Sequence, residues 1–260
     1  MQSIQRRRWE RENRSDAEPH LRNSQEEELQ QIENLDIAGF MEPANEVGGD
    51  YYDVLEHNGH IKIGIGDVTG HGLESGVLML MVQMAVQTLL SNEVNNPEIF
   101  LTVINRAIYR NVQRIETDKN LSLSLLDYQP SSEKETGGIL RVTGQHEEVL
   151  VVRKGGKIER VNTMDLGFIV GIIPNIAHTL SHLDIQLQQG DGIVLYTDGI
   201  TEAINLDKEF YQVERLCDVI TRNWHKNAKE IQELIIDDVR QFIGKQKVFD
   251  DITLLILKQK

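Results

Sequence analysis

A chain of 260 residues, of which 40% are hydrophobic and 26% charged, has the composition of a soluble globular protein and not of a disordered one. Its 41 acidic and 27 basic residues give a formal charge of −14, which argues against a protein that binds nucleic acid through clustered lysine and arginine. A single cysteine, Cys217, cannot form an internal disulfide and fits a reducing, cytoplasmic compartment. The polar, arginine-rich residues 1–14 do not resemble a signal peptide.

Residues 1–34 differ in composition from the rest of the chain. They contain six arginines, eight acidic residues and few large apolar side chains. This composition predicts a helical or flexible leader, which Pro19 would interrupt. Two hypotheses remain open for it: a segment that mediates homodimerisation or inhibition, and a loosely ordered extension. Residues 35–260 contain no internal repeat and no long linker, which predicts one α/β domain.

The first elements of this domain are predicted from apolar periodicity. Alternation over residues 61–65 predicts a half-buried strand. Residues 73–90 are apolar nearly all round, which predicts a buried helix; the polar side chains within this stretch make it a poor membrane span. Asn96 followed by Pro97 predicts the start of a further helix that extends to Ile115.

The remaining elements follow from apolar runs and turn residues. Strands are predicted over residues 121–127, 139–143, 149–153, 193–196 and 252–257. Asn227 and Glu230 form a predicted capping box at the start of a helix with an apolar stripe that ends near Ile243.

Four acidic sites share one pattern, an Asp at a strand edge beside glycine or a second Asp. They are Gly48-Gly49-Asp50, Gly66-Asp67-Val68-Thr69-Gly70-His71-Gly72, Thr197-Asp198-Gly199 and Asp250-Asp251. Hard divalent cations prefer oxygen ligands, and carboxylates brought together need a cation to neutralise them. The pattern therefore predicts a site for Mg²⁺ or Mn²⁺ if the four segments converge.

Each acidic site also has a simpler interpretation. Asp198 with its glycine could be a turn, Asp50 a turn or helix cap, and Asp250-Asp251 a solvated approach to the last strand. His71 could be a ligand or general acid, although a loop-packing or solvent-facing role is favoured. The glycine-rich loop at 66–72 matches neither common phosphate-binding motif.

Taken in order, the four motifs resemble those of the SpoIIE/RsbU branch of metal-dependent serine/threonine phosphatases, bacterial relatives of the phosphatase 2C superfamily. The resemblance extends from about Leu35 to Leu257. It implies a sandwich of two antiparallel β-sheets flanked by helices, with the metal ions in a cleft at one end. It also implies hydrolysis of phosphoserine or phosphothreonine on a partner protein, typically a STAS-type anti-sigma antagonist.

The resemblance also implies roles for individual residues. Asp67 would bridge two Mn²⁺ or Mg²⁺ ions, and the Val68 carbonyl would bind one of them. Asp50 would lie in the shell of that ion, whereas Asp198 and Asp250 would hold the other. Either Asp250 or Asp251 could be the ligand. Asp250 is favoured because of its place in the family motif. In such sites a water activated by two metal ions attacks the phosphoryl group, so no thiol nucleophile is needed.

Some features depart from the family pattern. No Lys or Arg lies between Glu42 and Asp53, where phosphatase 2C relatives often place a phosphate-binding arginine. Residues 144–147 and 121–124 also differ from the common motifs, and we expect these changes to affect packing or partner choice more than catalysis. Asp53 is expected to be a structural neighbour on the face opposite Asp50. The rival hypotheses are a catalytically silent regulatory module with the same fold and a nucleotide hydrolase.

Overall fold

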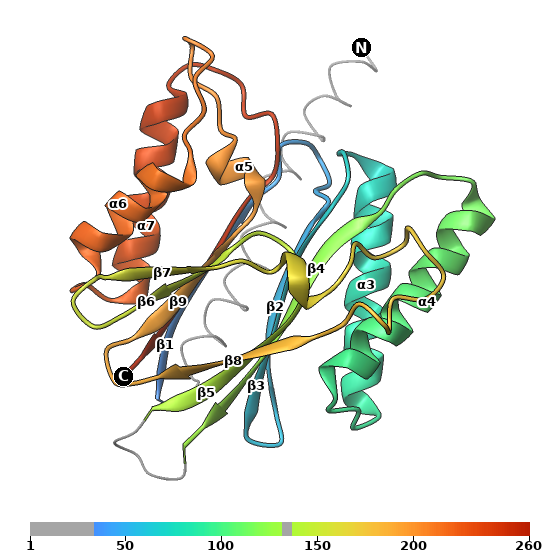
Figure 1. Cartoon of the computed structure of the whole chain (residues 1–260). Coiled ribbons are helices and arrows are strands. Elements are labelled where there is room, and N and C mark those ends of the chain that lie inside the picture. The colour runs from blue at the N-terminus through green and yellow to red at the C-terminus, as the bar shows by residue number, and fades with distance from the viewer. Residues whose placement is uncertain (1–33, 132–136) are drawn as a thin grey trace, which may run out of the picture.

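The computed structural model describes residues 34–131 and 137–260. Two antiparallel five-stranded sheets pack face to face, and helices cover both outer faces (Figure 1). This architecture confirms the helix-flanked β-sandwich implied by the sequence motifs.

The sheets draw their strands from distant parts of the chain. The first sheet has the order β1 (Leu35–Glu42), β10 (Ile252–Gln259), β9 (Gly192–Tyr196), β6 (Val149–Val152), β7 (Ile158–Val161). The second has the order β2 (Asp50–His57), β3 (His60–Val68), β4 (Leu121–Pro130), β5 (Gly138–Gln145), β8 (His182–Leu187). All strands predicted from apolar periodicity are present, whereas β1, β2, β7 and β8 were not predicted in this way.

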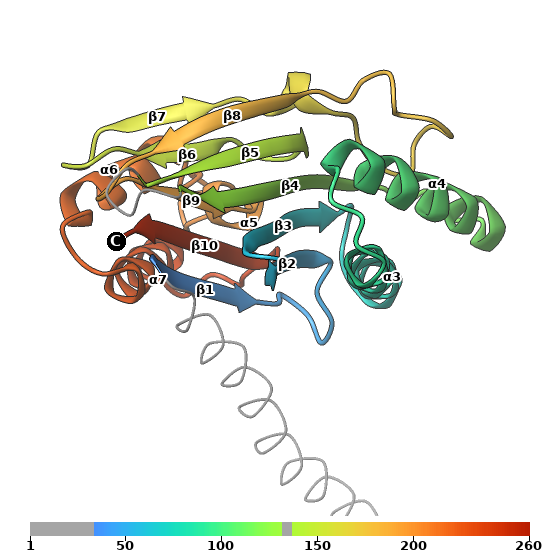
Figure 2. The ribbon, with the colours of Figure 1, turned by 90° about the horizontal axis from the view of Figure 1, so that it is seen from below.

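The helices form the outer layers of the molecule, as Figure 2 shows. Helices α3 (Leu73–Ser91) and α4 (Pro97–Ile115) pack on the second sheet, and α6 (Val213–Asn223) and α7 (Ala228–Ile243) on the first. A short helix α5 (Asp198–Thr201) follows β9, and a 3₁₀ turn spans Met164–Leu166. Buried side chains form one apolar cluster between the sheets and one beneath each helical layer.

Both predicted helix starts are confirmed. The Asn96 side chain accepts hydrogen bonds from the backbone N–H groups of Glu98 (2.8 Å) and Ile99 (3.0 Å) at the start of α4. At α7, the Asn227 side chain accepts from the Glu230 N–H (2.8 Å), and the Glu230 carboxylate accepts in return from the Asn227 N–H (3.2 Å). These local bonds satisfy N–H groups that the first turn leaves free.

Residues 73–90 form the predicted helix, but the prediction that this helix is buried is wrong. Helix α3 buries Leu78, Val82 and Val86 but leaves large apolar side chains on its outer face exposed. The exposed residues are Leu73, Val77, Leu80 and Met84. A helix in an outer layer contacts the sheet on one side only, so uniform apolarity does not bury it. Helix α3 is also the one described helix whose length and composition would suit a membrane span, with a mean hydropathy of 1.5.

Candidate active site

Four strand ends bring the acidic motifs to one end of the sandwich. Asp50 begins β2 and is the direct cross-strand partner of Asp67, near the end of β3. Asp198 follows β9 as the first residue of α5, and Asp250 lies just before β10. Because these strands run antiparallel, the starts of β2 and β10 meet the ends of β3 and β9. Figure 1 shows α5 and the start of α3 at this same end.

Asp50 lies deepest in the cluster, with 2% of its surface exposed. Its Oδ2 accepts hydrogen bonds from the hydroxyls of Thr197 (2.8 Å) and Thr253 (2.5 Å). Burial, together with the nearby charge of Asp67, raises the pKa of Asp50 to about 9 despite these hydrogen bonds. Neither threonine was given a role from the sequence, although Thr197 directly precedes Asp198 in its motif and Thr253 lies two residues after Asp251.

The other carboxylates also disfavour ionisation of one another. Burial and the charges of Asp198 and Asp250 raise the pKa of Asp67 to about 7. Burial and the charge of Asp250 raise the pKa of Asp198 to about 6. Partial desolvation is the main cause of a raised pKa at Asp250, although much of this side chain still reaches solvent, and the hydrogen bond from the Asp251 N–H and nearby His71 partly oppose the increase. The structure thus brings Asp50, Asp67, Asp198 and Asp250 into one electrostatic cluster that a cation would stabilise.

Asp251 is placed differently from Asp250. Its Oδ1 accepts from the Ala44 N–H (2.7 Å), and its Oδ2 accepts from the N–H groups of Gly49 (2.6 Å) and Asp50 (3.4 Å). The side chain is 3% exposed and holds the 44–50 segment against the start of β10. Its oxygens are therefore occupied by backbone donors, whereas Asp250 is exposed.

The motif glycines are required by close packing around Asp251 and Val68. A Cβ at Gly48 would lie 2.6 Å from Asp251 Oδ2, and a Cβ at Gly199 would lie 1.9 Å from the Asp251 carbonyl oxygen. A Cβ at Gly49 would lie 3.0 Å from the Val68 carbonyl oxygen, which faces the Gly48–Asp50 segment. The glycines consequently allow three acidic motifs to approach one another.

His146 ties the two sheets together beside this cluster. Its Nδ1 lies 2.7 Å from Ser122 Oγ on β4, and its Nε2 lies 3.1 Å from the Tyr196 carbonyl oxygen on β9. Burial lowers the pKa of His146 to about 4, so the ring is neutral near pH 7. The carbonyl can only accept, which requires Nε2 to donate and Nδ1 to accept from Ser122. The unusual segments at 121–124 and 144–147 therefore contact each other.

The cluster fits a divalent metal by its donor chemistry. Carboxylates and a backbone carbonyl are oxygen donors of the kind that Mg²⁺ and Mn²⁺ prefer. Across the described ranges 34–131 and 137–260, no group of three or more His, Cys, Asp or Glu side chains is placed so that it could hold a metal ion. Mg²⁺ commonly uses one or two carboxylates and keeps several waters, so an open arrangement suits it.

Basic groups lie at the margin of the cluster. Lys119 Nζ donates to the Thr69 carbonyl oxygen (2.7 Å) in the loop that follows Asp67. A hollow of about 130 Å³ adjoins Asp250, and its lining includes Phe210, Lys247 and Phe249. The hollow thus joins the acidic cluster to a surface with exposed aromatic side chains.

Asp53 lies outside the cluster. Its Oδ2 accepts from Gln87 Nε2 of α3 (3.3 Å), on the helical side of the second sheet. Asp50 instead contacts Thr197 and Thr253 at the ends of the other sheet's strands. The structure therefore confirms that Asp53 lies on the face of β2 opposite Asp50.

Comparison with known proteins identifies relatives with similar sequences. The model of the family described as Stage II sporulation protein E (SpoIIE) matches residues 57–260. The phosphoserine phosphatase RsbU of Bacillus subtilis is 27% identical over 234 residues, which are 88% of this chain and 65% of RsbU. Protein IcfG of Synechocystis is 24% identical, over 87% of this chain and 38% of IcfG. The chain thus spans less than two thirds of either relative.

Solved structures share the fold. The PP2C domain of SiaA from Pseudomonas aeruginosa superposes with a TM-score of 0.73 at 18% identity, with 86% of each chain covered. The phosphatase domain of SpoIIE from Bacillus subtilis gives 0.66 at 18% identity, over 86% of this chain and 62% of that one. RsbX in complex with magnesium gives 0.62 at 11% identity, over 89% and 98%.

Proposed function

The chain belongs to the SpoIIE family, and we propose that it is a metal-dependent phosphatase that hydrolyses phosphoserine or phosphothreonine on a partner protein. The observation that carries this proposal is the mutual electrostatic influence of Asp50, Asp67, Asp198 and Asp250 at one end of the sandwich. Each carboxylate by itself has a simpler interpretation, but a converged cluster is costly unless a cation neutralises it.

In this proposal the acidic residues hold two Mn²⁺ or Mg²⁺ ions. Asp67, Asp50 and the Val68 carbonyl would hold one ion, and Asp67, Asp198 and Asp250 would hold the other. When bound, the ions would activate a water and stabilise charge on the phosphoryl oxygens. We propose Asp250 over Asp251 as a ligand because three backbone N–H groups already donate to Asp251.

The surrounding residues would position these ligands. Thr197 and Thr253 hold one oxygen of Asp50, which leaves its other oxygen for the metal side. Asp251 aligns the glycine segment that precedes Asp50. No Arg occurs between Glu42 and Asp53. We therefore propose that affinity for a protein substrate comes largely from contacts beyond the phosphate.

The substrate class is also a proposal. RsbU is named a phosphoserine phosphatase, and another solved relative combines RsbU and RsbW domains. We propose a phosphorylated STAS-type anti-sigma antagonist as substrate, in a cytoplasmic partner-switching system. We do not expect nucleic acid or membrane as a partner, because the acidic charge of −14 disfavours polyanions and the α3 stretch is interrupted by polar side chains.

The test measures phosphate release by the full chain from a phosphorylated STAS-domain protein and from p-nitrophenyl phosphate. Activity should require Mn²⁺ or Mg²⁺ and disappear with a chelator. Asp67→Asn and Asp198→Asn should each lower kcat by about a hundredfold or more, because each removes a negative metal ligand. Asp218→Asn, on an exposed part of α6, is the matched control and should be unaffected. Retained activity in either folded site variant would contradict the assignment, and absence of activity in the unaltered chain would favour a silent regulatory module.

A further inference from the structure

His146 directly follows β5 and links the two sheets beside the acidic cluster. Its Nδ1 lies 2.7 Å from Ser122 Oγ of β4, in the second sheet, and its Nε2 lies 3.1 Å from the Tyr196 carbonyl oxygen of β9, in the first. Because the carbonyl can only accept, Nε2 carries the proton and Nδ1 accepts from the Ser122 hydroxyl. The imidazole ring is therefore a polar bridge between the sheets.

Both bonds of this bridge end beside proposed metal ligands. Ser122 is the direct cross-strand partner of Asp67 in the register of β3 and β4. Tyr196 ends β9, and Asp198 follows it by two residues as the first residue of α5. The bridge thus connects the strand next to Asp67 with the strand end that carries Asp198.

The backbone of His146 is held as well as its ring. Thr163 Oγ1 accepts from the His146 N–H (3.0 Å) and donates to the His146 carbonyl oxygen. Thr163 is 1% exposed, so water does not compete for these two bonds. A side chain whose backbone and ring nitrogens are all bonded is restricted to one position, which suits a spacer of fixed length.

The two proposed ions differ in how they depend on the distance between the sheets. Asp50, Asp67 and Val68, which would hold one ion, lie on β2 and β3, and these strands pair directly within the second sheet. The other ion would be held by Asp67 of the second sheet together with Asp198 and Asp250, which adjoin β9 and β10 of the first. The second of these ions spans both sheets, and the first does not.

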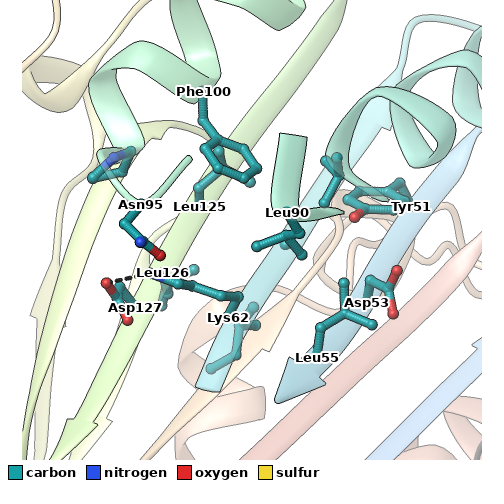
Figure 3. Close-up of a pocket in the computed structure, with 14 residues that line it drawn as sticks. Tyr51, Asp53, Leu55, Lys62, Leu90, Asn95, Phe100, Leu125, Leu126 and Asp127 are labelled. Atoms are coloured by element: carbon teal, nitrogen blue, oxygen red, sulfur yellow. Dashed lines mark hydrogen bonds and ion pairs between the residues drawn. The ribbon is translucent and has the colours of Figure 1, made fainter. Parts of the chain in front are cut away.

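The second sheet is packed densely enough to hold its own ligands in place. Apolar side chains, among them Leu90, Phe100 and Leu125, fill the layer between this sheet and helices α3 and α4 (Figure 3). They leave a cavity of only about 30 Å³, room for one or two waters. Because dense packing resists displacement, the arrangement of β2 and β3 should not depend on His146.

From these contacts we propose that His146 is a positioning residue that sets the separation of Asp67 and Asp198, and thereby the affinity for the ion between the sheets. The inference rests on the proposed two-ion site. His146 would touch neither ion, because both of its ring nitrogens are already bonded. The segments 121–124 and 144–147 would then act on metal binding and not on packing alone.

The test measures Mn²⁺ binding by the full chain without substrate, from the EPR signal of free Mn²⁺ and by calorimetry. The unaltered chain should bind two ions. His146→Leu can make neither bond, so it should weaken one site about tenfold and leave the other within about twofold. His146→Gln carries a donor and an acceptor on one planar amide, so both sites should stay within about threefold of the unaltered chain.

Further variants identify the affected site. Asp198→Asn removes a ligand of the ion between the sheets, so the double variant with His146→Leu should still bind the ion of the second sheet. His57→Leu, at the end of β2 opposite Asp50, is the control and should change neither site. Thermal unfolding establishes that each variant is folded at the temperature of the titration.

The outcomes separate positioning from stability. A role in stability alone would lower the Tm of His146→Leu without weakening one site more than the other. Equal weakening of both sites in folded His146→Leu, or two unchanged sites, would overturn the inference, and so would equal losses in His146→Gln and His146→Leu. Fewer than two Mn²⁺ ions bound by the unaltered chain would instead contradict the two-ion site itself, and this inference with it.

Discussion

Asp250 and Asp251 are adjacent in sequence but have different surroundings. Asp251 is buried and receives three backbone N–H groups, whereas Asp250 is exposed and, among the described residues, its Oδ1 accepts from the Asp251 N–H alone (2.9 Å). A carboxylate whose lone pairs are occupied by backbone donors supports the fold, and one that is free at a cluster of acids can bind a metal. The pair therefore separates a structural role from the proposed catalytic one.

Asp251→Asn should mainly destabilise the fold. The amide removes the charge and places a donor against a backbone N–H, which we expect to cost about 3 kcal/mol of unfolding free energy and roughly 5–10 °C in Tm. Asp250→Asn is the matched variant, since its amide oxygen can still accept from the Asp251 N–H. That change should leave Tm within about 2 °C and abolish phosphatase activity. Thermal unfolding and turnover of both variants check this pair, and the reverse pattern would exchange the two roles.

The raised pKa values of the cluster predict a pH-dependent stability in the absence of metal. The pKa of Asp50 is about 9 and that of Asp67 about 7, both above the ordinary value of 3.8, so the folded state retains protons that the unfolded state has released. The contribution of such groups is complete below about pH 4 and is lost as pH rises through 7 and 9. The unfolding free energy of the metal-free protein should therefore fall over this range.

Urea denaturation at several pH values between about 7 and 9 measures this slope, with chelator and with Mg²⁺. Mg²⁺ should restore most stability at the upper end, because it replaces the lost protons. His146 contributes little to this slope, since its pKa of about 4 keeps it neutral in the folded state and the unfolded imidazole is mostly deprotonated above pH 7. Asp50→Asn should flatten the slope in chelator. A slope that is the same with and without Mg²⁺ would argue against metal binding at the cluster.

At the level of elements, the site depends on how closely α5 approaches the start of β10. A Cβ at Gly199 would lie 1.9 Å from the Asp251 carbonyl oxygen, which is backbone and cannot rotate away. Gly199→Ala should therefore displace α5, lower Tm by more than about 5 °C and reduce activity. Gly155→Ala is the control, since Gly155 has positive φ but nothing within 4 Å of a Cβ. The Gly155→Ala control introduces backbone strain alone and should lower the unfolding free energy by only about 1–2 kcal/mol.

The hollow between α5 and the approach to β10 predicts a difference between protein and small substrates. Lys247 and the exposed Phe249 line this hollow beside Asp250. Lys247→Glu and Phe249→Ser should raise KM for a phosphorylated protein about tenfold, because they remove contacts outside the phosphate. The kcat/KM for p-nitrophenyl phosphate should change less than about twofold. Equal losses on both substrates would place these residues in the catalytic machinery instead.

At the scale of the whole molecule, the open question is the role of the leader. Residues 1–33 lie outside the described residues, so the predicted role of residues 1–34 in homodimerisation or inhibition stays a prediction. The boundary between the leader and the domain, placed between residues 34 and 35, also stays a prediction. Asn34 accepts from the Lys260 N–H (2.9 Å) through its carbonyl oxygen, which connects the start of β1 to the end of β10. A deletion should therefore keep Asn34.

Removal of residues 1–33 should leave a folded domain with Tm within about 2 °C of the full chain, because the two sheets and their clusters begin at Leu35. If the leader is a switch, the truncated chain will differ from the full chain in oligomeric state or in turnover. Analytical ultracentrifugation and phosphatase assays measure the two properties. No change in either would leave the leader as a simple extension.

Much of the fold was predictable because its signals are local. The caps at Asn96 and Asn227 are formed by side chains that bond within three residues, and the strand at 252–257 is one apolar run. The exposure of α3 was not predictable in this way, since its apolar side chains continue past the face that packs on the sheet. Short strands such as β7 (Ile158–Val161) also give too little periodic signal.

The sequence by itself determined which four segments carry acidic residues beside glycine, and their order already indicated the family. Only the tertiary structure decided what each Asp does. Asp251 meets its backbone donors across more than two hundred residues of chain, and Thr253 reaches Asp50 across a similar separation. Such partners are brought together by the closure of two sheets, which short-range sequence patterns do not encode. The same closure brings His146 between Ser122 of one sheet and Tyr196 of the other.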